Sequence, residues 1–118
     1  MLSVKDEGRL LRITEYCQRI ISKIEKIDKD KFNSDQDLKE IVSFNIFQIG
    51  ELAKGFSLEF IKKYDGVPWK HIKGMRDIIG HGYGAVDFEM VYNTAKEDIP
   101  ILLDYCCAII EEISQSKV

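Results

Sequence analysis

The 118-residue chain has little of what stabilises secreted or membrane proteins. Its three cysteines, two of them adjacent, do not make a disulfide framework, and no Cys-x-x-Cys or nearby pair of histidines suggests a metal site. No apolar run reaches the roughly 18 residues of a membrane helix, and the charged first residues lack the apolar centre of a signal peptide. We therefore expect one cytoplasmic domain over residues 1–118, without membrane or metal, in which Cys17 and Cys106 are buried, reduced thiols.

Only two prolines interrupt the chain, and no stretch alternates apolar and polar residues as a strand does, so helices are expected almost throughout. Ser3 is the expected N-cap of a first long helix, with Asp6 and Glu7 in its first turn. The apolar residues of this helix recur at steps of three and four and share one face: Leu10, Ile13, Cys17, Ile20, Ile24 and Ile27. The polar stretch Asp28–Gln36 has no period and is predicted to be a loop.

A second helix is expected to begin near Ser34 or Asp35. Asn45 on its apolar face is either a buried, hydrogen-bonded polar residue or a residue that sets the register at a dimer seam. Gly50 lies in the middle of this helix, where glycine costs about 1 kcal/mol relative to alanine. It either permits the close approach of another helix or is merely tolerated. A short helix over Ser57–Lys63 and a turn are expected to follow.

A third helix is predicted over Trp69–Ile79, with Pro68 in its first turn, and Asp87 is the expected cap of the last helix. The apolar face of that last helix keeps its register across Pro100, which predicts one helix kinked at the proline. The residues of the face are Phe88, Tyr92, Ala95, Ile99, Leu102, Cys106, Ile109 and Ile113. The predicted fold is all-α, an up-and-down bundle of four main helices plus a short helix.

Charge is unevenly distributed along the chain. The net charge of −3 argues against a protein that coats nucleic acid in general, but it leaves room for one that handles RNA locally. Residues 54–76 hold six basic and two acidic residues, whereas residues 77–118 hold two basic and eight acidic residues. The basic segment is either an anion site or an ordinary solvated face.

The basic segment leads into a glycine-rich stretch that contains His81, the more informative of the two histidines. Arg76 precedes it by five residues and Tyr83 follows it by two. Histidine exchanges protons near neutral pH, and arginine is a permanent cation suited to phosphate. On a straight helix these two residues lie about 140° apart. Either Gly80 breaks the helix and re-aims the histidine, or the site is completed across a dimer.

The segment Arg76-Asp77-Ile78-Ile79-Gly80-His81-Gly82-Tyr83 matches the pattern R-x-x-x-x-H-x-Y, and with its flanks it resembles HEPN-domain toxins of the HepT kind. The flanking segments are Ile49–Lys54, Val67–Lys70, Gly74–Asp77, and Val86-Asp87 to Asp98–Pro100. The chain departs from the family pattern at Gly80 and Gly82, where many relatives carry larger residues.

The resemblance implies a small helical homodimer that acts on RNA as a metal-independent endoribonuclease and toxin, with no cofactor. Arg76 and His81 match the catalytic pair, and Asp77 matches a supporting polar residue. Tyr83 matches the tyrosine to which the partner antitoxin, a nucleotidyltransferase like MntA, transfers AMP. Lys70 and Lys73 are expected to guide the RNA backbone.

The sequence is also compatible with two other functions. In one, the chain is a weakly catalytic binding subunit of a nucleotidyltransferase; in the other, it is a purely structural helical dimer. Three further residues are expected to have structural rather than catalytic roles. Glu51 is expected to line or support the cleft, Trp69 to anchor the core or an interface, and His71 to be exposed or to face a partner.

Overall fold

The computed structural model describes residues 2–67, 69–81 and 86–116, apart from the side chains of residues 78, 80 and 81. Every regular element among these residues is a helix, which confirms the predicted all-α fold. The elements are α1 (Val4–Ile24), α2 (Lys29–Ser34), α3 (Gln36–Lys54), α4 (Leu58–Lys63), α5 (Trp69–His81), α6 (Phe88–Asn93), a π-helical turn η2 (Thr94–Asp98) and α7 (Ile99–Ser116). In the described part of the chain, no helix combines the length and the apolar character needed to cross a membrane.

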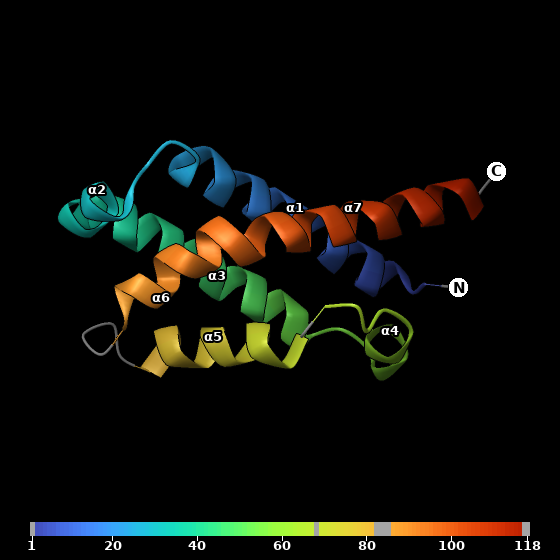
Figure 1. Ribbon diagram of the computed structural model, residues 1–118. Helices are drawn as coiled ribbons and strands as arrows, with labels where there is room; N and C mark the ends of the chain where they lie inside the picture. Colours follow the sequence, from blue (N-terminus) through green and yellow to red (C-terminus); the bar gives the residue numbers. More distant parts are fainter. Residues whose placement is uncertain (1, 68, 82–85, 117–118) are drawn as a thin grey trace.

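The long helices alternate in direction, as an up-and-down bundle requires (Figure 1). Helix α3 packs against α1 on one side and α5 on the other, and α7 packs along α1. The beginning of α1 and the end of α7 therefore lie on the same side of the molecule (Figure 1). Helix α5 packs chiefly on α3, so much of the α5 surface is not covered by the other helices.

The predicted core is confirmed by the burial of the apolar faces. Cys17 and Cys106 are buried and free, as expected. Burial raises the pKa of both thiols, that of Cys106 to about 12, so both stay protonated. Asn45 is buried and donates through Nδ2 to the carbonyl oxygen of Ile41 at 2.7 Å, which satisfies it within its own helix.

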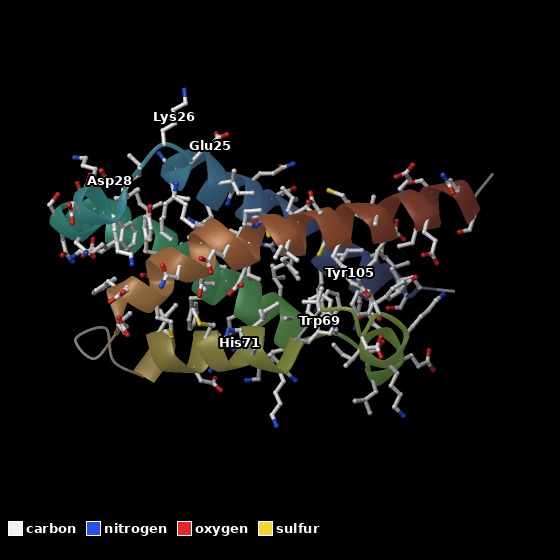
Figure 2. The ribbon with its side chains drawn as sticks, in the orientation of Figure 1. Glu25, Lys26, Asp28, Trp69, His71 and Tyr105 are labelled. Atoms are coloured by element: carbon white, nitrogen blue, oxygen red, sulfur yellow. The ribbon has the colours of Figure 1, made fainter. Side chains whose placement is uncertain are left out.

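The segment between α4 and α5 is held by two aromatic side chains (Figure 2). The indole N–H of Trp69 donates to the carbonyl oxygen of Tyr64 at 2.6 Å, and Trp69 is 3% exposed. The backbone N–H of Gly66 donates to the hydroxyl of Tyr105 on α7 at 3.0 Å. Trp69 is therefore a core anchor, and these bonds hold the start of α5 in place.

The prediction of a loop over residues 28–36 is wrong, because these residues contain the short helix α2. Asp28 caps it by accepting from the backbone N–H of Lys31 at 2.8 Å, and Asp35 caps α3 in the same way through Leu38. Phe32 is fully buried, with its ring 5.3 Å from that of Tyr92. A helix of six residues that buries one side chain is too short to show a period.

Helix α5 extends beyond the predicted end at Ile79, through Gly80 to His81. Glycine within a helix costs only about 1 kcal/mol, so it does not by itself end one. The predicted place of Pro68 in the first turn, and the stretch that holds Gly82 and Tyr83, lie outside the described residues.

The last helix is continuous from Phe88 to Ser116, as predicted, with a π-helical turn directly before Pro100. At this turn the backbone N–H of Ile99 donates to the carbonyl oxygen of Thr94, five residues back. Proline has no N–H to donate and crowds the preceding turn, and a wider turn accommodates both effects.

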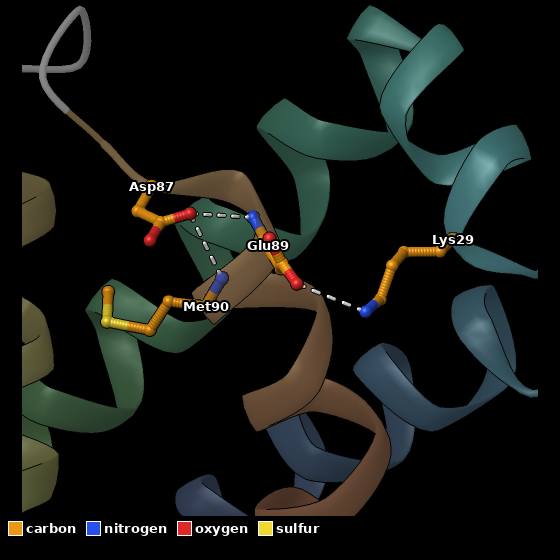
Figure 3. A network of polar contacts seen from close by, with 4 residues as sticks. All are labelled: Lys29, Asp87, Glu89 and Met90. Carbon is orange, nitrogen blue, oxygen red and sulfur yellow. Dashed lines mark hydrogen bonds and ion pairs between the residues drawn. The ribbon is translucent and has the colours of Figure 1, made fainter.

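The start of α6 is fixed by polar contacts (Figure 3). The carboxylate of Asp87 accepts from the backbone N–H groups of Glu89 at 3.0 Å and Met90 at 3.3 Å, which confirms it as the cap. The carboxylate of Glu89 pairs with Lys29 of α2 at 3.2 Å, an exposed pair of small energetic value.

A buried carboxylate ties the first helix to α4. Asp6 is 3% exposed and accepts from the backbone N–H of Ser57 at 3.0 Å and from its hydroxyl at 2.6 Å. Burial by itself raises the pKa of Asp6, but the hydrogen bonds from Ser57 outweigh it, and the pKa lies below its usual value of 3.8.

We predict that Asp6→Ala destabilises the fold by about 1–3 kcal/mol at neutral pH, because the N–H of Ser57 loses its acceptor. Since the folded pKa is lowered, this contribution is complete above the usual pKa and is lost as the pH falls through and below it. Urea unfolding at a series of pH values should therefore show the two proteins converging in acid. Asp30→Ala, which removes an exposed carboxylate from α2, is the control and should change little.

Candidate functional site

Arg76 lies at the seam between α5 and α3, where three side chains hold it. Its Nε donates to the carboxylate of Glu51 on α3, and its Nη1 donates to the carboxylate of Asp77 at 2.8 Å. The guanidinium carbon lies 5.3 Å from the centre of the Phe47 ring, a cation–π contact. The side chain of Arg76 remains 26% exposed, so the fixed cation is still open to solvent.

Gly50 is the position on α3 that lets Arg76 come so close. A Cβ atom at Gly50 would overlap the Cβ of Arg76 and lie 3.1 Å from the carbonyl oxygen of Ile72. Both obstacles lie on or next to the α5 backbone and cannot swing away. Of the two roles considered for Gly50, close helix approach is the one that the structure supports.

A shallow hollow of about 440 Å³ opens beside this seam. It is lined by Gly50, Lys54, Lys70, Lys73, Gly74, Arg76 and Asp77, and is called the basic hollow below. Four of its lining residues are basic and one is acidic, so it attracts anions. The structure thus brings the predicted pair, Lys70 and Lys73, to the same hollow as Arg76 and Asp77.

Glu51 was expected to line or support the cleft, and it does so by binding Arg76, whereas Phe47 and Lys54 were not singled out as site residues from the sequence. These residues are separated by steps of four and three on α3, so they share one face. The sequence shows that these residues share a face of α3. It does not show which helix packs against that face, because the spacing within one helix carries no information about its neighbour.

The electrostatics of Arg76 follow from its contacts. The carboxylates of Asp77 and Glu51 raise the pKa of the guanidinium above its usual value, so it stays protonated. A guanidinium carries five N–H donors, and the two hydrogen bonds named above occupy two of them. The other three have no hydrogen-bond partner among the residues that the structure describes, and the side chain is 26% exposed, so an anion that enters the basic hollow can reach it.

The structure describes the backbone of His81 but not its side chain, and Tyr83 lies outside the described residues. Because α5 continues to His81, the alternative in which Gly80 breaks the helix is not seen. Helical spacing places position 81 in the row of Lys70, Gly74 and Asp77, at steps of four, three and four. The described members of this row, Lys70, Gly74 and Asp77, line the basic hollow, whereas the Cβ of Arg76 faces Gly50 on α3.

The opposite side of α5 borders a second, apolar cleft of about 290 Å³. His71 lies there, on the side of α5 that faces α7 (Figure 2), and is exposed as predicted. The cleft is otherwise lined by residues such as Ile49, Met75 and Leu102.

Within the described residues, no three His, Cys, Asp or Glu side chains gather closely enough to hold a metal.

Residues 13–109, most of the chain, match the family described as "Ribonuclease HepT-like". The chain belongs to the HepT-like ribonuclease family. The resemblance inferred from the Arg76–Tyr83 segment and its flanks is therefore confirmed at the level of the family.

Relatives of this HepT-like chain carry matching names. "Putative RNase TTE0752" of Caldanaerobacter subterraneus subsp. tengcongensis is 33% identical over 93 residues, 79% of this chain and 83% of that protein. "Probable ribonuclease HepT" of Thermococcus cleftensis is 30% identical over 95 residues, 75% of this chain and 86% of that protein. A longer protein of Methanocaldococcus jannaschii, "Gamma-glutamylcyclotransferase and putative RNase MJ0434", is 34% identical over 109 residues. That match covers 86% of this chain but 49% of the protein, so the chain spans about half its length. No solved structure matches the chain.

The packing of Gly50 on Arg76 in this HepT-like chain gives a direct prediction. Gly50→Ala should destabilise the fold by about 1–3 kcal/mol in denaturant unfolding, because the added methyl forces α3 and α5 apart. Gly8→Ala on α1 is the matched control, since a Cβ there meets nothing within 4 Å. It should stabilise the fold by up to about 1 kcal/mol, as alanine usually does in a helix. Equal effects of the two substitutions would contradict the close-approach role.

Proposed function

We propose that this HepT-like chain is a metal-independent endoribonuclease that acts as the toxin of a toxin–antitoxin pair. Arg76 binds the scissile phosphate and stabilises its developing charge, Asp77 orients Arg76, and His81 moves protons. Lys70 and Lys73 hold the RNA backbone. The observation that carries the proposal is the fixed, partly exposed cation of Arg76 in the basic hollow, on a helix that continues to His81.

The proposed chemistry uses the RNA's own 2′-hydroxyl as the nucleophile. A histidine accepts the 2′ proton, the 2′ oxygen attacks the phosphorus, and the bond to the 5′ oxygen breaks as that oxygen gains a proton. The products are a 2′,3′-cyclic phosphate and a free 5′-hydroxyl. Arg76 and the lysines offset the charge that builds up on the phosphate oxygens.

Two proton transfers suit two histidines, one accepting and one donating. Each chain has one histidine in the motif Arg76–Tyr83, namely His81, whereas His71 borders the apolar cleft. A homodimer supplies the second copy of His81, and with α5 unbroken at Gly80 it is the arrangement we propose.

We predict that the purified protein cleaves RNA in the presence of EDTA and leaves 2′,3′-cyclic phosphate ends. His81→Ala should slow cleavage by about 10²–10⁴-fold, since it removes the proton-transfer group. Arg76→Ala should slow it by about 10²–10³-fold. His71→Ala is the matched control and should retain activity. Cleavage that is equally sensitive to both histidine substitutions, or unaffected by either, would refute the assigned roles.

Modification of Tyr83 is the proposed means of neutralisation. A nucleotidyltransferase antitoxin like MntA transfers AMP from ATP to the tyrosine hydroxyl and releases pyrophosphate, which adds bulk and negative charge beside the RNA site. Incubation with such an enzyme and ATP should raise the intact mass by whole AMP units and abolish cleavage. Tyr83→Phe should gain no mass and stay active, whereas Tyr105→Phe should be modified as the wild type is.

A second candidate is a regulatory subunit of a nucleotidyltransferase that has little nuclease activity of its own. The two carboxylates that bind Arg76 favour it, because they compete with a phosphate for the guanidinium. A stable complex with the nucleotidyltransferase and no RNA cleavage by the unmodified protein would select this candidate.

A further inference from the structure

Helix α3 carries an aromatic surface next to the basic hollow. Phe44, Phe47, Glu51 and Lys54 follow one another at steps of three, four and three, so they share one face of the helix. Phe47 is half-buried under the Arg76 guanidinium, and Phe44 lies one turn earlier. The face thus runs from two aromatic residues through Glu51, which pairs with Arg76, to the basic Lys54 over about 15 Å of helix.

The exposure of Phe44 sets it apart from the other aromatic side chains. It is 56% exposed, and it is the one phenylalanine, tyrosine or tryptophan among the described residues whose side chain is exposed rather than buried or half-buried. Core packing therefore does not account for a phenylalanine here. An exposed aromatic ring beside a cation is the arrangement with which proteins bind unpaired nucleic-acid bases.

The charge beside the ring favours the same occupant. The basic hollow presents Lys54, Lys70 and Lys73 to the phosphates of a strand. The exposed ring of Phe44, one turn from Phe47 on the same helix face, is open to its bases. A single strand offers both features at once. In a duplex the base faces are stacked inside and are not available to a protein side chain.

We propose that Phe44 and Phe47 form a stacking platform for unpaired RNA bases, continuous with the basic hollow, and that this platform makes the site select single-stranded RNA. The proposal rests on the proposed function, since it assigns the RNA at that site. Phe44 supplies the open ring. Phe47 supports the platform and holds Arg76 against it.

The test measures binding without cleavage. The probe is a short, unstructured 2′-O-methyl RNA strand, which lacks the nucleophilic hydroxyl, and its affinity for the full-length protein is read by fluorescence anisotropy. Phe44→Ala should weaken binding by about five- to a hundredfold, the usual effect of losing one stacked base. Phe44→Trp should retain or improve it. Ile101→Ala, which removes a 67% exposed apolar side chain from α7, is the matched control and should bind as the wild type does.

Two further probes separate stacking from charge. A duplex of the same sequence and a strand with abasic sites should bind equally well to the wild type and to Phe44→Ala. Lys70→Ala with Lys73→Ala should weaken binding of all three probes and reduce its salt dependence. Unchanged binding of the single strand by Phe44→Ala, or an equal loss on all probes, would overturn the platform while leaving the proposed function intact.

The remaining outcomes are also decisive. If Phe44→Ala changes the oligomeric state in analytical ultracentrifugation, the ring lies between two copies of the chain and the platform is wrong. If the wild type binds none of the probes and cleaves no RNA, the proposed function itself fails, and the platform fails with it.

Discussion

The close contact between Gly50 and Arg76 is the constraint on which the site depends. Without a side chain at Gly50, α3 and α5 approach until the Cβ of Arg76 lies against the α3 backbone. At that separation the guanidinium reaches Glu51 and the Phe47 ring, and it is fixed rather than mobile. A cation that is already in place pays no ordering cost when an anion arrives, which is the condition for effective charge stabilisation.

Two sides of α5 can line clefts because the hydrophobic core is formed mainly by the other long helices. Helices α1, α3 and α7 bury most of the apolar faces, while α5 packs chiefly on α3. The two sides of α5 therefore differ in character. One borders an apolar cleft with His71, and the other lines the basic hollow with Lys70, Lys73 and Asp77. The chain is acidic overall, but this hollow is basic, because Lys54, Lys70 and Lys73 gather beside Arg76.

Sequence periodicity predicted the long helices and their buried faces well, because a period needs several turns to be visible. It failed at α2, a six-residue helix in which Phe32 is the one buried residue. The end of α5 was also misplaced, because the glycine content after Ile79 suggested that the helix stops there, whereas it continues to His81. The π-helical turn before Pro100 was also not foreseen. Its position follows from how the backbone adjusts to a missing N–H, and several adjustments are compatible with the same residues.

The sequence by itself determined the helical class, the caps at Ser3 and Asp87, and the motif that resembles the family to which the chain belongs. These features depend on residues close together in the chain, where the number of residues between two positions fixes how they lie relative to each other on a helix. Only the tertiary structure decided that Gly50 meets Arg76, that Glu51 binds Arg76 across the seam, and that Lys54 and Phe47 join the site. Which faces of two helices meet depends on the packing of the whole bundle, and that information is not carried by any single segment.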